Sequence, residues 1–137
     1  MLITLDNQSH QLRVTRYSRE EIWVGASRIR GACVLSANQL DTNWAATGID
    51  TLTLELLEPL LRLQPRILLI GAAVGGLRPP AALRRAVEAR GLALECMELG
   101  AACRTYNVLS QEGREVVAGL ITAPATLAGS APEEDTG

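Results

Sequence analysis

The residues best placed for chemistry lie between Gly91 and Asn107, in the stretch G-L-A-L-E-C-M-E-L-G-A-A-C-R-T-Y-N. Its first half is an apolar run typical of a buried strand, and its second half is typical of a helix start. The N-terminus of a helix presents unpaired backbone N–H groups and a positive partial charge. The stretch therefore predicts a binding site at a corner between a strand and a helix, and a carboxylate or another small anion suits such a site.

A second loop is expected to face the same corner. Gly71–Gly76, with the sequence G-A-A-V-G-G, follows the apolar run I-L-L-I. Ligands of parallel sheets bind beyond the carboxyl ends of the strands, where this loop and Glu98–Asn107 would meet. Arg78 and Arg104 can both lean toward that crevice and bind an anion. The loop has neither G-x-G-x-x-G spacing nor a Walker lysine, so a tight turn with a solvated arginine explains it equally well.

Cys103 is the candidate nucleophile of the corner. It would lie in the first turn of the helix beside Arg104, where the helix dipole and the cation both lower the pKa of a thiol. Packing is the favoured interpretation, because free cysteine is among the residues most often buried. The sole histidine of the chain, His10, lies in a polar leader, which argues against Cys-His and Ser-His catalysis and against a histidine metal centre.

Three polar or aromatic residues complete the corner. Tyr106 is expected to be a core anchor whose hydroxyl reaches a polar partner. Asn107 has poor helix propensity, so it is expected to hydrogen-bond a loop or a ligand. Glu98 is the one carboxylate clearly placed at the strand end, and a single carboxylate is weak evidence for acid–base catalysis. The sequence therefore assigns no catalytic residue.

Composition excludes several other classes of protein. The three cysteines, Cys33, Cys96 and Cys103, are an odd number without C-x-x-C spacing, which argues against a disulfide framework and a zinc site. We expect no cofactor. The net charge of −2 gives no electrostatic footprint for nucleic acid, and no apolar run approaches the ~20 residues that cross a bilayer. Met1–His10 does not resemble a secretory signal, so the cytoplasm is the expected location.

Two groups of elements must position the corner. Alternating residues predict an N-terminal antiparallel β meander, with strands at Gln11–Tyr17, Ile22–Gly25 and Ile29–Ser36. Residues 37–50 have turn chemistry, with Trp44 as a large anchor. A helix is predicted from the N-cap Thr53 to about Leu63.

From Arg66 onward, apolar runs alternate with helical spacing and predict the order β-α-β-α-β. The predicted elements are Arg66–Ile70, a helix from Pro80 to Arg90, Leu92–Met97, a helix at Ala101–Glu112, and Glu115–Ile121. Right-handed crossovers make these strands parallel. The sequence therefore predicts an α/β fold, a single three-layer domain over residues 1–123 with a mixed sheet, followed by a disordered acidic tail at 124–137.

The run A-A-C-R-T-Y-N-V-L-S-Q-E-G-R-E-V-V-A-G-L-I, preceded by G-L-A-L-E-C-M and I-L-L-I-G, resembles the Mth-domain family. The resemblance is strong from about Arg66 to Ile121 and looser from Leu12 to Trp44. It implies a compact three-layer α/β domain of unknown biochemical activity. The family includes the adipogenesis-associated Mth-domain protein and a mitochondrial assembly factor for respiratory complex I. Its signature falls on Gly71, Ala102, Tyr106, Asn107, Gly113 and Arg114.

The chain departs from the family pattern at two positions. The family usually has a Gly-Thr/Ser-Gly turn where this chain has Gly71, Ala72 and Ala73, and it has a threonine near the position of Leu99. The loss of both hydroxyls weakens the case for a phosphate cradle.

The sequence thus leaves two hypotheses. The leading one is a non-enzymatic adaptor or assembly-factor-type domain, possessing a corner and a β meander that together dock a protein partner. The alternative is a binder of a small anionic ligand, or a weak enzyme, at the crevice between Gly71–Gly76 and Glu98–Asn107. The candidate binding residues are Gly71, Arg78, Glu98, Cys103, Arg104, Tyr106 and Asn107.

Overall fold

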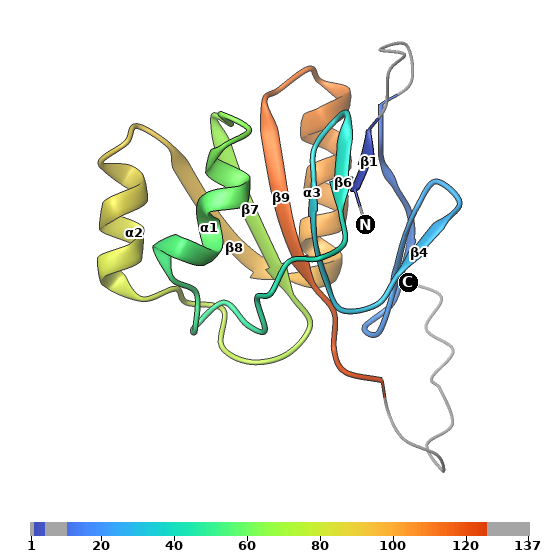
Figure 1. The fold of residues 1–137 in the computed structure, drawn as a ribbon, viewed down its shortest axis with the longest axis horizontal. Helices are drawn as coiled ribbons and strands as arrows, with labels where there is room; N and C mark the ends of the chain where they lie inside the picture. Colours follow the sequence, from blue (N-terminus) through green and yellow to red (C-terminus); the bar gives the residue numbers. More distant parts are fainter. Residues whose placement is uncertain (1, 5–10, 126–137) are drawn as a thin grey trace.

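The computed structural model describes residues 2–4 and 11–125 (Figure 1). The predictions for His10 and for residues 126–137 of the acidic tail lie outside these residues. The strands are β1 (Leu2–Thr4), β2 (Val14–Tyr17), β3 (Ile22–Val24), β4 (Ser27–Ile29), β5 (Ala32–Leu35), β6 (Gln39–Asp41), β7 (Ile67–Ala72), β8 (Ala93–Glu98) and β9 (Val116–Ile121), and the helices are α1 (Leu54–Leu61), α2 (Ala81–Glu88) and α3 (Leu99–Gln111).

A mixed six-stranded sheet with the order β1-β6-β5-β9-β7-β8 forms the middle of the fold. Strand β7 pairs in parallel with both β8 and β9, whereas β5 pairs antiparallel with β9 and with β6. The chain thus crosses from β7 to β8 through α2. It then returns past β7 to β9 through α3. Right-handed crossovers in opposite directions place these two helices on opposite faces of the sheet. The predicted β-α-β-α-β unit is confirmed.

Two apolar clusters, one on each face of the sheet, form the core. Leu68 and Ile70 of β7 pack in the first cluster, with α1, α2 and the segment around Trp44. Leu69 packs in the second, with α3 and a separate three-stranded antiparallel sheet of the order β2-β3-β4. Figure 1 shows α1 and α3 on opposite sides of the large sheet. The three predicted layers are therefore present, and β7 is apolar on both faces because both are covered.

The predicted strand at Ile29–Ser36 is wrong as a single element. The chain turns at Gly31, which has a φ of +99°, so β4 ends before it and β5 begins after it. Strand β4 stays in the small sheet, while β5 crosses into the large sheet beside β9. The side chain of Thr122 fixes this turn, because its Oγ1 accepts a hydrogen bond from the Gly31 N–H and donates one to the Gly31 carbonyl. The β meander is therefore β2–β4.

Local signals place the first helix and its anchor as predicted. The Thr53 hydroxyl caps α1 by accepting a hydrogen bond from the Leu56 N–H at 3.1 Å. Trp44 is buried and donates a hydrogen bond from Nε1 to the Leu56 carbonyl at 2.7 Å. The segment predicted as turns also contains the short strand β6, which pairs with β1. Among the helices of the described residues, none has the length and apolar character to cross a membrane.

Candidate functional site

The predicted corner is formed where β8 ends and α3 begins. The helix starts at Leu99, two residues before the predicted start, and Glu98 is its N-cap. The Glu98 Oε1 accepts a hydrogen bond from the Ala101 N–H at 3.1 Å. This carboxylate lies where an anionic ligand of the helix N-terminus would lie, and its charge offsets the partial positive charge there. The chain therefore supplies its own anion at the corner.

Gly71 lies beneath the first turns of α3. A Cβ at Gly71 would overlap the Cβ of Ala102 and would lie 3.3 Å from the Cα of Leu99. The helix thus rests directly on the backbone of β7, with no side chain between them. The missing side chain at Gly71 therefore allows the close approach of α3 to the sheet.

Tyr106 and Asn107 bind the N-terminal part of the chain to α3. Tyr106 is fully buried, and its hydroxyl donates a hydrogen bond to the Leu12 carbonyl at 2.9 Å. The Asn107 amide makes two hydrogen bonds with Val14: Nδ2 donates to the carbonyl at 2.8 Å, and Oδ1 accepts from the N–H at 3.0 Å. Asn107 thereby pairs with the edge of β2 as a neighbouring strand would. The predicted polar partner of the Tyr106 hydroxyl is confirmed as a backbone carbonyl. Asn107 does use its amide, but its partner is a residue of strand β2 and not the predicted loop or ligand.

Replacing Asn107 with alanine should destabilise the protein by about 2 kcal/mol, because it leaves both backbone groups of Val14 without their partner. Hydrogen exchange would show the loss as faster exchange of the Val14 amide. Val108→Ala is the matched control, since this neighbouring side chain is 54% exposed and its truncation should cost little. An unchanged exchange rate of the Val14 amide in Asn107→Ala would contradict the expectation.

Arg104 faces the small sheet. Its Nη1 donates a hydrogen bond to the Tyr17 hydroxyl at 2.6 Å, and its Cζ lies 5.9 Å from the centre of the Tyr17 ring. Gly100 leaves room for this contact, since a Cβ there would lie 3.0 Å from the Tyr17 Cε2 and 3.4 Å from the Arg104 Nη1. Arg104 therefore links α3 to β2.

Arg78 lies apart from this group, in the exposed loop that leads to α2. Within the described residues, no hydrogen bond or ion pair joins it to Arg104 or Glu98. The glycines of its loop lie near a carboxylate, since a Cβ at Gly76 would be 3.3 Å from the Asp50 Oδ2. The structure thus groups Glu98, the N-cap of α3, with Cys103, Arg104, Tyr106 and Asn107 of the helix above Gly71, whereas Arg78 lies in another loop.

Cys103 is fully buried on the inner face of α3. Burial raises the pKa of its thiol to about 12; Glu98 raises this pKa further, and Arg104 lowers it. Burial also raises the pKa of Cys33 to about 12 and that of Cys96 to about 11. These thiols stay protonated at neutral pH, which supports packing over a reactive thiolate. The described residues contain no group of three or more His, Cys, Asp or Glu side chains that could hold a metal ion.

The buried thiols predict a stability that falls at alkaline pH. Below pH 9.0, the ordinary pKa of a thiol, both the folded and the unfolded chain keep these protons. Between pH 9.0 and about 12, the unfolded chain releases a proton from Cys103 that the folded chain retains, so the free energy of unfolding decreases as the pH rises. Urea unfolding midpoints on both sides of pH 9.0 would measure this. A Cys103→Ala variant should show a weaker pH dependence, and an undiminished one would contradict the assignment.

The sequence interpretation missed two features around the corner. It did not identify Tyr17 as the partner of Arg104, which lies 87 positions away along the chain. It also passed over the outward residues of the small sheet, where Trp23 pairs with Arg16 on one side and Arg28 on the other. The alternation in I-W-V carries the signal for the second feature, because Trp23 lies between the apolar residues Ile22 and Val24, and Arg28 precedes the apolar Ile29.

Comparisons with known proteins agree with this fold. A family model described as "Protein of unknown function (DUF498/DUF598)" matches residues 14–121. NADH dehydrogenase (ubiquinone) 1 alpha subcomplex assembly factor 3 of Bos taurus is 30% identical over 115 residues, which are 81% of this chain and 61% of that protein. The chain therefore spans about three fifths of the length of this curated relative.

Two solved structures share the fold over most of its length. A Bordetella parapertussis protein, known from a crystal structure, has a TM-score of 0.76 at 30% identity, covering 83% of this chain and 98% of its own. A Bordetella pertussis protein, described as a Mth938-like domain, has a TM-score of 0.71 at 25% identity, covering 85% of this chain and 89% of its own. The residues 14–121 that match the family model run from the first strand of the small sheet to the last strand of the large one.

Proposed function

Since the chain belongs to the DUF498/DUF598 family of proteins of unknown function, with the Mth-like fold that its sequence predicted, we propose that it is a non-enzymatic protein-interaction domain. Its homology to complex I assembly factors supports an assembly-factor-like role at the level of the family. This homology is the observation that carries the proposal. The specific role proposed here is the assembly of a respiratory NADH dehydrogenase, in the cytoplasm or on its side of the membrane.

The contacts at the corner support an adaptor over an enzyme. General acid–base or nucleophilic catalysis needs a group that is free to reach substrate. Glu98 caps a helix, Arg104 binds Tyr17, and Asn107 binds Val14. Tyr106 is buried with its hydroxyl on a backbone carbonyl. Arg104 and Asn107 thus hold the small sheet against α3, while Tyr106 holds the segment that precedes it.

The alternative, a small anionic ligand at the crevice, has no support from these contacts. The carboxylate of Glu98 lies at the helix N-terminus that would bind an anion, and Asp50 lies beside the glycine loop. A second negative charge would be repelled at both places.

Capture of partners in the source organism tests the proposed function. The tagged protein, isolated after mild crosslinking, should enrich subunits of the NADH dehydrogenase over a strain that expresses the tag alone. Deletion of the gene should lower the amount of assembled complex on native gels, and the wild-type gene should restore it. A normal amount of complex in the deletion strain, together with no enriched protein above background, would refute the proposal.

A further inference from the structure

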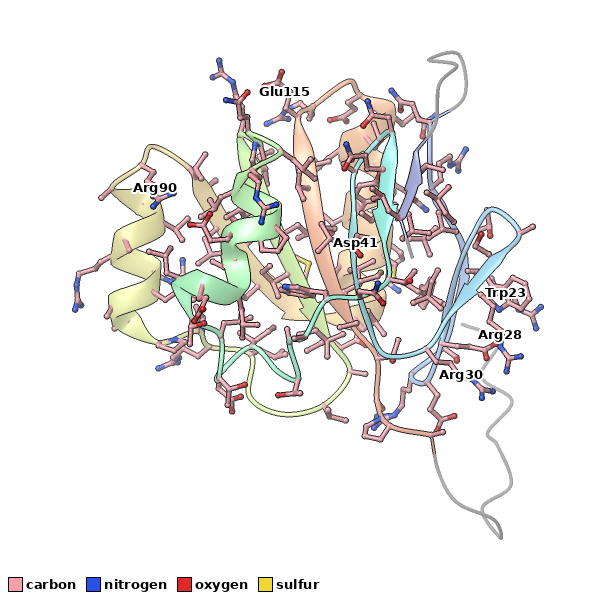
Figure 2. All side chains as sticks on the ribbon, viewed as in Figure 1. Trp23, Arg28, Arg30, Asp41, Arg90 and Glu115 are labelled. Carbon is pink, nitrogen blue, oxygen red and sulfur yellow. The ribbon has the colours of Figure 1, made fainter. Side chains whose placement is uncertain are left out.

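The outer face of the small sheet carries a row of arginines around a tryptophan. In the strand register, Arg16 of β2 lies opposite Trp23 of β3, which lies opposite Arg28 of β4. The flanking residues Ile22 and Val24 are buried against α3, so by alternation Trp23 points outward. Figure 2 shows Trp23, Arg28 and Arg30 together on the side of the small sheet that faces away from the large sheet.

Glu21 holds this group in one arrangement. Its Oε2 accepts a hydrogen bond from the Trp23 Nε1 at 3.0 Å, and its Oε1 accepts one from the Arg28 Nε at 2.8 Å and lies 3.5 Å from the Arg30 Nε. The hydrogen bonds from Trp23 and Arg28 lower the pKa of Glu21, so it remains a carboxylate. We call Arg16, Glu21, Trp23, Arg28 and Arg30 the Arg-Trp surface.

An approaching molecule meets the cations of this surface before it meets the carboxylate. The side chains of Arg28 and Arg30 are 47% and 58% exposed, whereas that of Glu21 is 24% exposed. The arginines thus keep N–H donors for an outside partner while Glu21 fixes their direction. Fixed donors lose less entropy on binding than mobile ones.

The Arg-Trp surface is a basic part of an acidic protein. Residues 13–30 contain five arginines and two glutamates, a net charge of +3, whereas the whole chain has a net charge of −2. The remainder of the chain therefore has a net charge of −5. A long polyanion such as nucleic acid would contact this remainder and be repelled. A short acidic segment that covers only the small sheet would not.

We propose that the Arg-Trp surface docks an acidic segment, rich in Asp and Glu, of a partner protein. Guanidinium groups bind carboxylates through paired N–H donors, and a tryptophan beside them supplies the apolar anchor typical of protein interfaces. This inference rests on the proposed function, because it names the chemistry of the partner that an assembly-factor-type domain would recognise. It assigns the docking to residues outside the corner itself.

A titration with a short capped poly-Glu peptide tests the proposal. Trp44 is buried, so a change in tryptophan emission should report Trp23, and Trp23→Phe should abolish it. The triple variant Arg16→Gln/Arg28→Gln/Arg30→Gln should bind the peptide about tenfold more weakly, since three exposed charge pairs are lost. The control Arg62→Gln/Arg85→Gln/Arg90→Gln changes the net charge equally elsewhere, and Figure 2 shows Arg90 at the far end of the molecule from Trp23. This control should bind like the wild type, and a poly-Gln peptide should not bind.

Three outcomes would overturn the proposal. The first is an equal weakening of peptide binding in both triple variants, which would mean that the peptide responds to the net charge of the protein and not to the Arg-Trp surface. The second is binding of single-stranded DNA more tightly than the peptide. The third is about tenfold tighter peptide binding after replacement of Glu133, Glu134 and Asp135 by their amides, which would assign the surface to the chain's own acidic triplet.

The same variants separate this inference from the proposed function. If the Arg16/Arg28/Arg30 variant still captures NADH dehydrogenase subunits at the wild-type level, the Arg-Trp surface is not the docking site, although the function stands. If the wild type captures none and the complex assembles without it, the function is refuted, whatever the peptide result.

Discussion

Gly71→Ala should lower the free energy of unfolding by about 3 kcal/mol, a large part of the stability of an ordinary domain. The added methyl would overlap the Cβ of Ala102 and lie 3.3 Å from the Leu99 Cα, so α3 itself would have to move. The Leu120 Cδ2, at 3.4 Å, limits movement on the other side. A rigid helix cannot yield as the end of a flexible side chain can. Urea unfolding followed by circular dichroism would measure the loss.

Ala102→Gly provides the control for this prediction. Alone, it should cost about 1 kcal/mol through its lower helix propensity. Combined with Gly71→Ala, it removes the overlapping methyl group, so the double variant should be more stable than Gly71→Ala alone. Because the two residues touch, their effects should not add. Additive losses would show that the overlap between these two methyl groups is not the cause.

Trp44→Ala should destabilise the protein by about 3–5 kcal/mol. Trp44 is 7% exposed and its Nε1 donates to the Leu56 carbonyl at 2.7 Å, joining the loop before α1 to the helix. Its ring fills the space above Gly119, where a Cβ would lie 2.6 Å from the Trp44 Cζ3. Removal of the ring leaves a cavity between α1 and β9. The urea midpoint and the melting temperature should both decrease.

Gly119→Ala tests whether the Trp44 ring packs directly on Gly119. In the wild type it should destabilise the protein by about 1–3 kcal/mol, because the new methyl collides with the indole. In the Trp44→Ala background the same change should cost almost nothing, because the ring is absent. An equal cost in both backgrounds would be inconsistent with the contact.

The sequence predicted the elements that depend on local pattern. Leu68–Ile70 is apolar on both faces of a strand, and this pattern requires cover on both sides. Thr53 is a favoured capping residue, and it caps α1. Asparagine is unfavourable inside a helix unless its amide makes a hydrogen bond, and the Asn107 amide bonds the backbone of Val14. These signals are local and physical, so they could be interpreted without the fold.

The remaining features depend on contacts between distant residues. Alternation shows which face of a strand is apolar but not which sheet the strand joins, so the division at Gly31 was not predictable from it. Strand β6 has three residues, too few to show a period. Glu98 is not a residue type favoured at an N-cap, and the sequence therefore gave no sign of its role. The site was predicted as a location, but the partners of its side chains were not.

The link between Asn107 and Val14 spans 93 positions, and strand β5 likewise pairs with β9 near the far end of the chain. During synthesis, the segments from β2 to β6 leave the ribosome long before α3 and β9 exist to receive them. Until then, their apolar faces remain exposed to solvent or bound to a chaperone. Contacts between such distant positions also slow folding. The risk of aggregation for this protein is therefore high in the interval before α3 and β9 have been translated.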